Sequence, residues 1–113
     1  MRVAMIQMDM QLGKPEANFE KAEKLVQMAA ELKPDVITLP ETWNTGFFPR
    51  ENLKELSDVN LEQTQKLFSR LAKEYRVNMI AGSVANCRGE KIYNTATVFN
   101  RDGEMVAEYD KVH

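Results

Sequence analysis

The sequence predicts an α/β fold built on a mixed sheet, with its elements in the order βαβαβββ. Two short apolar runs flank an amphipathic helix, a second amphipathic helix follows, and the last part of the chain alternates in the manner of strands. A strand, a helix and a strand in succession form a right-handed crossover with parallel strands. Strands joined by a tight turn are antiparallel, so both pairings occur and the sheet is mixed.

The N-terminal part of the chain predicts a strand, a helix and a second strand. Residues 2–9 are almost continuously apolar, which indicates a central strand buried on both faces. From 15 to 32 apolar residues recur at helical spacing among lysines and glutamates, which predicts an amphipathic helix. Lys33-Pro34 ends this helix, because a proline disfavours helical geometry in the residue before it. Residues 35–39 are rich in β-branched residues, and they predict the second strand.

The middle of the chain predicts an irregular segment, a helix and a third strand. Residues 40–59 are punctuated by proline and glycine, and we expect no regular structure there. An apolar stripe at helical spacing predicts a helix over 60–75, with Asn60 as its N-cap. The third strand is predicted over 78–84.

The C-terminal end predicts a hairpin. Residues 91–99 and 104–112 alternate between apolar and polar, and Asp102-Gly103 between them is a signal for a tight turn. Neither an internal repeat nor a linker composition interrupts the sequence. We therefore interpret residues 1–113 as belonging to a single domain.

Composition argues against several classes of protein. Fifteen basic and seventeen acidic residues give a net charge of −2, and they form no basic stripe, so nucleic acid is not an expected partner. No apolar run reaches membrane-spanning length, and the N-terminus lacks the pattern of a secretory signal, so no membrane association is expected. A single cysteine cannot form an internal disulfide. These features predict a cytoplasmic protein.

Two charged residues stand at predicted strand ends. Glu41 follows the strand at 35–39, and Pro40 fixes the direction in which the chain leaves the sheet. Lys111 ends the last predicted strand. Taken singly, Glu41 fits a solvated loop glutamate and Lys111 fits an edge-strand lysine that blocks pairing between sheets. Taken together, an acid and a base at strand ends indicate a catalytic edge, where rigid strands hold side chains at fixed separations.

The flanks of these two residues resemble the motifs of a known family. Leu39-Pro40-Glu41, continued by 42–47, and Tyr109-Asp110-Lys111-Val112-His113 are similar to the glutamate and lysine motifs of the nitrilase, or carbon-nitrogen hydrolase, superfamily. Further pieces follow the order that this family uses, namely Val3 to Met8, Asn18, Ala81-Gly82-Ser83, Tyr93-Asn94-Thr95 and the turn from Asn100 to Gly103. Within the family, the pattern is nearest to small aliphatic amidases, including omega-amidases.

The resemblance implies a Glu-Lys-Cys triad that hydrolyses a small amide or nitrile through a covalent intermediate on a cysteine. Glu41 would act as the general base, a role that needs its pKa raised by burial from about 4.3. Lys111 would stabilise the negative charge that develops on the substrate oxygen. Phe47 is a candidate for the substrate pocket, although an apolar anchor of the loop is the simpler interpretation. No cofactor is implied.

The family's cysteine lies beyond its lysine motif, and no residue among these 113 occupies that place. Cys87, the single thiol, is predicted in a polar loop between two strands and does not match the family's cysteine segment, so we interpret it as a bystander. His113 lacks ligand partners at suitable spacing, and we expect no metal site.

The family's fold is an αββα four-layer sandwich, and residues 1–113 encode only its N-terminal part, a single incomplete domain. Three interpretations stay open: part of an intact hydrolase, which we favour, an inactive association module, or a thiol enzyme that uses Cys87. The coding sequence beyond residue 113 separates the first two, and a Cys87→Ala variant tests the third. Such sandwiches commonly pair, so a homo-oligomer is expected.

Overall fold

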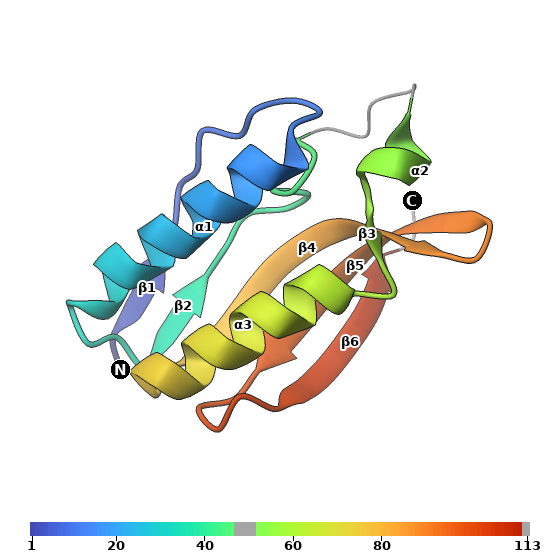
Figure 1. Cartoon of the computed structure of the whole chain (residues 1–113). Coiled ribbons are helices and arrows are strands. Elements are labelled where there is room, and N and C mark those ends of the chain that lie inside the picture. The colour runs from blue at the N-terminus through green and yellow to red at the C-terminus, as the bar shows by residue number, and fades with distance from the viewer. Residues whose placement is uncertain (47–51, 112–113) are drawn as a thin grey trace.

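The computed structural model describes residues 1–46 and 52–111 as a sheet covered by helices on one face. The elements in chain order are β1 (Val3–Met5), α1 (Pro15–Ala30), β2 (Val36–Thr38), α2 (Leu53–Leu56), β3 (Asp58–Val59), α3 (Glu62–Tyr75), β4 (Asn78–Arg88), β5 (Lys91–Phe99) and β6 (Met105–Lys111). Figure 1 shows α1 and α3 side by side across the sheet.

The strand order confirms the predicted mixed α/β sheet. Along its main path the sheet runs β1-β2-β4-β5-β6, and β3 pairs separately with β4. The pairs β1–β2, β2–β4 and β3–β4 are parallel, whereas β4–β5 and β5–β6 are antiparallel. The turn from Asn100 to Glu104 also forms as predicted, since the Asn100 N–H donates to the Glu104 carbonyl over 2.9 Å.

The first strand differs from its prediction in length and place. β1 covers only Val3–Met5 and lies at the edge of the described sheet, so the expectation of a central strand over 2–9 is wrong. Val3 and Met5 are exposed, while Ile6 and Met8 leave the strand and pack half-buried against the core. The apolar run therefore forms first a short edge strand and then a non-strand segment that packs against the core. Periodicity alone does not distinguish these two parts.

The segment before the second long helix is ordered by a carboxylate. Part of the region predicted to be irregular forms α2 and β3. Asp58 of β3, and not Asn60, caps α3: its Oδ1 accepts the Gln63 N–H over 3.1 Å and its Oδ2 accepts the Thr64 N–H over 2.9 Å. Asn60 is exposed and sits in the left-handed region with φ of 51°. The free N–H groups at the start of α3 are therefore bonded by the buried Asp58 and not by Asn60.

β4 is longer than predicted because its polar residues find partners on neighbouring elements. It extends from Asn78 to Arg88, so Cys87 lies in a strand and is buried, in contrast to the predicted loop position. Asn86 accepts the Leu61 N–H at the start of α3 over 2.8 Å. The polar composition predicts a loop, but Asn86 Oδ1 and the Arg88 guanidinium bond to other elements, which allows the strand to continue, while the buried Asn86 Nδ2 has no partner among the described residues.

The core lies between the sheet and the two long helices. Trp43 is fully buried there, with its ring centroid 4.6 Å from that of Phe19 on α1 and 5.6 Å from that of Phe68 on α3. Its Nε1 donates to the carbonyl of Ala81 in β4 over 2.9 Å. One side chain therefore ties both helices to the sheet, and its only polar group is satisfied.

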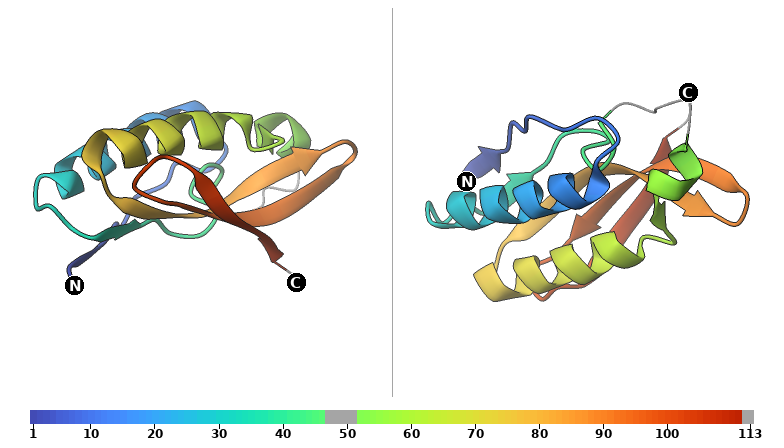
Figure 2. Two further views of the ribbon diagram at one scale, coloured as in Figure 1. Left: turned by 90° about the horizontal axis from the view of Figure 1, so that it is seen from below. Right: turned by 45° about the horizontal axis from the view of Figure 1, so that its top comes forward.

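The opposite face of the sheet carries no described helix, as the edge-on view in Figure 2 shows. The strand registers align one row of side chains across this face, namely Met5, Thr38, Ile80, Val98 and Ala107. Met5 is 79% exposed and Ile80 is 42% exposed. We call this surface the open face.

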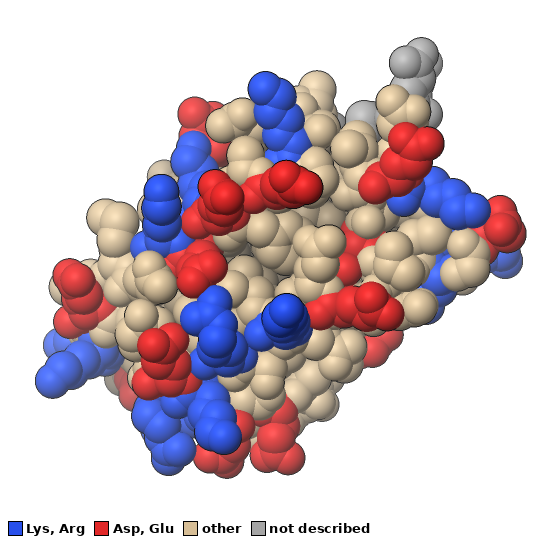
Figure 3. All heavy atoms as spheres, in the orientation of Figure 1, with Lys and Arg blue, Asp and Glu red and all other residues tan. Residues whose placement is uncertain are grey.

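The helix-covered face has a mixed charge. In Figure 3 lysine and arginine side chains alternate with acidic ones over α1 and α3, without a large area of one sign. Among the helices of the described ranges, none combines the length and the apolar character needed to cross a bilayer.

Residues 1–113 expressed alone are expected to be aggregated, molten or tightly dimerised, because the open face leaves apolar side chains in water. Analytical ultracentrifugation and calorimetry measure this. Ile80→Thr should increase the monomeric fraction, whereas Met28→Gln, on the exposed side of α1, should not. A monodisperse wild-type monomer that melts cooperatively would contradict the prediction.

Candidate active site

The segment that carries Glu41 leaves β2 and runs along the edge of β4. The Leu39 N–H donates to the Ile80 carbonyl over 3.0 Å. Further along, Asn44 satisfies both backbone groups of Ala85: its Nδ2 donates to the Ala85 carbonyl over 3.1 Å, and the Ala85 N–H donates to its Oδ1 over 2.9 Å. The Asn44 carboxamide thus takes the place of a partner strand beyond the end of β2.

Helix α1 holds Asn44 from the other side. Asn18 Nδ2 donates to the carbonyls of Asn44 and Gln11, each over 2.8 Å, and the Gln11 N–H returns a bond of 2.8 Å to Asn18 Oδ1. Asn18 and Asn44 are both fully buried. Buried amides with these bonds satisfied fix a single arrangement, so the backbone after Glu41 is held from two sides.

A glycine allows the backbone before Glu41 to approach β4 closely. Gly82 has φ of +64°, and a Cβ placed there would lie 2.2 Å from the Pro40 carbonyl oxygen. The register of β4 against β5 shifts between Ile80 and Ser83, next to this contact. Ser83 Oγ then accepts the Thr42 N–H over 3.0 Å. A side chain at position 82 would push the Pro40-Glu41 peptide away from the sheet.

Glu41 and Lys111, which lie 70 positions apart, meet in the structure. Lys111 Nζ forms an ion pair and hydrogen bond with Glu41 Oε1. The Lys111 side chain is 32% exposed and that of Glu41 is 68% exposed, so the described residues do not bury the carboxylate as a general base requires. Asn94 lies opposite Lys111 in β5, and its buried Oδ1 has no hydrogen-bond partner among the described residues.

A hollow of about 480 Å³ opens beside Glu41. Its wall is largely apolar, and it is lined by Met8, Asp9, Met10, Leu12, Glu41, Thr42 and Gly46. The residues that follow the first strand therefore contribute to the surroundings of Glu41. The predicted pocket residue Phe47 lies outside the described residues, and so does His113.

Cys87 is separate from this arrangement. It is 4% exposed, and its Sγ donates to the Gly89 carbonyl over 3.3 Å. Among the hydrogen bonds of the described residues, none joins it to Glu41 or Lys111. Within residues 1–46 and 52–111, no group of three or more histidine, cysteine, aspartate or glutamate side chains is placed to hold a metal ion.

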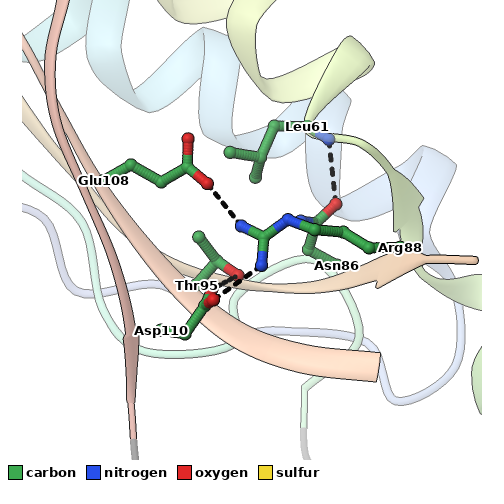
Figure 4. Close-up of polar contacts among 6 residues, drawn as sticks. All are labelled: Leu61, Asn86, Arg88, Thr95, Glu108 and Asp110. Atoms are coloured by element: carbon green, nitrogen blue, oxygen red, sulfur yellow. Dashed lines mark hydrogen bonds and ion pairs between the residues drawn. The ribbon is translucent and has the colours of Figure 1, made fainter. Parts of the chain in front are cut away.

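An ion-pair cluster on the helix-covered side of β6 was not predicted from the sequence. Arg88 Nη1 donates to Asp110 Oδ2 over 2.6 Å, and its Nη2 pairs with Glu108. The Thr95 hydroxyl donates to Asp110 Oδ1 over 2.7 Å. The Arg88 guanidinium holds the pKa of the Asp110 carboxyl below its ordinary value, and Asp110 in turn raises the pKa of Arg88. Figure 4 shows these side chains converging from β4, β5 and β6. The signal in the sequence is the pair of acids Glu108 and Asp110, which are two positions apart in a strand and therefore point to the same face.

Comparison with known proteins assigns the chain to a family. The model of the carbon-nitrogen hydrolase family matches residues 2–113. The chain belongs to the carbon-nitrogen hydrolase family. It is 37% identical, over its whole length, to a protein of Staphylococcus aureus described as a hydrolase in the agr operon. It is 35% identical over 98% of its length to the 2-oxoglutaramate amidase of Bacillus subtilis.

Other carbon-nitrogen hydrolases extend the comparison. Human omega-amidase NIT2 is 33% identical over 99% of the chain. The crystal structure of Saccharomyces cerevisiae Nit3, a member of branch 10 of the nitrilase superfamily, superposes with a TM-score of 0.88 and 23% identity over the whole chain and 44% of Nit3. The chain spans 43%, 42% and 40% of the length of the three sequence relatives named here. It therefore corresponds to less than half of each.

The close approach at Gly82 predicts an unequal cost for two glycine substitutions. Gly89 also has a positive φ, of +61°, but a Cβ there would meet nothing within 4 Å. Gly89→Ala should lower the free energy of unfolding by about 1 to 2 kcal/mol, the cost of the left-handed backbone. Gly82→Ala should cost a further 1 to 3 kcal/mol or so, because the Pro40 carbonyl must move. Urea unfolding of the full-length protein measures both, and equal losses would contradict the prediction.

The lowered pKa of Asp110 predicts a dependence of stability on pH. Its folded pKa lies below the unfolded value of about 3.9, so its stabilising effect is complete above that value and disappears as the pH falls through the folded pKa. Between about pH 5 and pH 2, the wild type should lose more stability than Asp110→Asn. Asp102→Asn is the control, since Asp102 pairs with Arg76 at 3.5 Å and both are well exposed. Urea unfolding at each pH gives the free energy of unfolding as a function of pH. The curves for wild type and Asp102→Asn should be parallel, and that for Asp110→Asn should be flatter.

Proposed function

We propose that this chain supplies the Glu-Lys part of an amidase that converts a small aliphatic amide to an acid and ammonia. One observation carries the proposal: a carboxylate and an ammonium from distant strand ends, Glu41 and Lys111, are in contact beside a hollow. Membership of the carbon-nitrogen hydrolase family supports it, as do relatives that are described as amidases.

The nucleophile of this reaction is a cysteine thiolate supplied from outside residues 1–113. Its thiol proton passes to the Glu41 carboxylate as the sulfur attacks the amide carbon, and the Lys111 ammonium faces the oxygen on which negative charge develops. The carbon-nitrogen bond then breaks, and Glu41 returns the proton to the departing ammonia. A water molecule, deprotonated by Glu41, attacks the thioester carbon and releases the acid and the thiol.

The arrangement of the two charges suits this sequence of proton transfers. The Glu41 carboxylate is the proton acceptor of the pair, and the Lys111 ammonium is in contact with it. Burial of Glu41, which the described residues leave 68% exposed, is then provided by the rest of the assembled site. The apolar wall formed by Met8, Met10 and Leu12 suits an aliphatic acyl chain.

A second candidate function follows from the open face. Its apolar row, which includes Met5 and Ile80, fits an association module that has lost catalysis and pairs through the sheet. The two functions differ in a measurable way. An association module would form stable complexes without releasing ammonia from any amide. An amidase releases ammonia, and its rate falls when Glu41 or Lys111 is replaced.

Glu41→Gln and Lys111→Ala should each lower the rate of ammonia release by about 10²-fold or more, because the first removes the base and the second removes the charge that stabilises the oxyanion. The measurement is ammonia release by the full-length protein over a panel of small amides, including monoamides of dicarboxylic acids. Cys87→Ala is the control and should leave turnover unchanged. Near-normal rates in either charged-site variant would refute the assignment, and loss of turnover in Cys87→Ala would favour the thiol enzyme.

A further inference from the structure

We propose that Arg88 is a positioning residue that fixes the end of β6 and thereby aims Lys111 at the reacting oxygen. The inference rests on the proposed function of Glu41 and Lys111. It concerns a residue on the opposite side of the sheet, which contacts neither of them in the described structure. Arg88 acts through β6, and the contacts that transmit its effect are all between described side chains.

Arg88 reaches across β5 to two carboxylates of β6. It is the last residue of β4, and its Nη1 and Nη2 donate to Asp110 and Glu108, respectively. A planar guanidinium that spans two acceptors defines their separation and direction, which a single ion pair does not. Thr95, fully buried in β5, donates to the second oxygen of Asp110. The Asp110 carboxylate is therefore bonded at both oxygens, once from β4 and once from β5 (Figure 4).

The guanidinium itself has restricted freedom. Its Cζ lies 4.9 Å from the centroid of the Tyr93 ring, so the cation packs over the aromatic face. The Arg88 side chain is 30% exposed, which leaves it only partly open to solvent. The Tyr93 ring and the two carboxylates together hold the Arg88 guanidinium in one geometry. A lone surface ion pair, in contrast, samples many geometries.

The cluster controls Lys111 because neighbouring residues in a strand point to opposite faces. Asp110 points to the helix-covered side, where Arg88 and Thr95 meet it, so Lys111 must point to the open face, where Glu41 lies. Within the described sheet β6 has a single neighbour, β5, and Lys111 is its last residue. The end of an edge strand frays readily, and the Arg88 bonds restrain it at the residue before the ammonium.

This role separates rate from stability. Partly exposed ion pairs contribute little to folding, with typical values of about 0 to 1 kcal/mol. A displacement of about 1 Å in a group that meets the transition state can nevertheless lower the rate about 10²-fold. Loss of Arg88 should therefore be visible mainly in turnover. Substrate binding should change little, because Lys111 acts on charge that develops only in the transition state.

The test compares Arg88→Met, which keeps the apolar stem, with Arg88→Lys, which keeps the charge but not the fork. In the full-length protein Arg88→Met should lower kcat for amide hydrolysis at least tenfold with KM within about twofold, and Arg88→Lys should recover part of the loss. The matched control is Arg70→Met, because Arg70 also bridges two carboxylates, Glu23 at 2.9 Å and Glu74 at 3.6 Å, but on the helices. A kcat that is equal in Arg88→Met and Arg70→Met would overturn the proposal.

A double-mutant cycle separates action through Lys111 from a general structural effect. Arg88→Met added to Lys111→Ala should cause no further loss of kcat beyond about twofold, whereas a full tenfold additional loss would overturn the proposal. Asp110→Asn provides a second route to the same loss if Arg88→Met folds poorly. Failure of the proposed function gives a different result, because Lys111→Ala by itself would then leave turnover unchanged.

Discussion

Attachment of residues 39–46 to the free edge of β4 is the constraint on which the rest of the site depends. β2 ends after three residues, so β4 continues with an unpaired edge that a buried sheet cannot leave unsatisfied. Asn44 supplies both missing hydrogen bonds to Ala85, and Gly82 removes the side chain that would keep the Pro40 peptide away. With its flanks fixed in this way, Glu41 projects from a rigid frame although it belongs to a loop.

The partner of that frame is the end of β6. In the sheet β6 is three strand spacings from β2, or roughly 14 Å, so side chains at the two strand ends do not meet in a flat sheet. Two long side chains, the segment that continues beyond β2 and the twist of the strands close this gap on the open face. The separation between the Glu41 and Lys111 side chains therefore depends on the geometry of the whole sheet. Clusters far from the two residues, such as that of Arg88, can change this separation.

Much of the fold was predictable because its signals are local. The helices around Val26 and Leu71 follow from apolar spacing within one segment, and the hairpin turn at Asp102-Gly103 follows from two residues. Predictions went wrong where the decisive partner is distant. Asp58 displaces Asn60 as the cap of α3 because β3 is held on β4. Cys87 is buried in a strand whose polar residues Asn86 and Arg88 bond to the start of α3 and to β6.

The sequence by itself determined the α/β class, the order of most elements and the two charged residues to examine, since each depends on periodicity or on a short motif. Only the tertiary structure decided that Glu41 and Lys111 touch, that β1 lies at an edge, and that Arg88 clamps the strand behind Lys111. The physical reason is that strand order, register and twist are set by packing over the whole sheet. The flanks of Glu41 and Lys111 imply a shared site through family resemblance, but the contact between these residues, 70 positions apart, follows only from how the sheet places them.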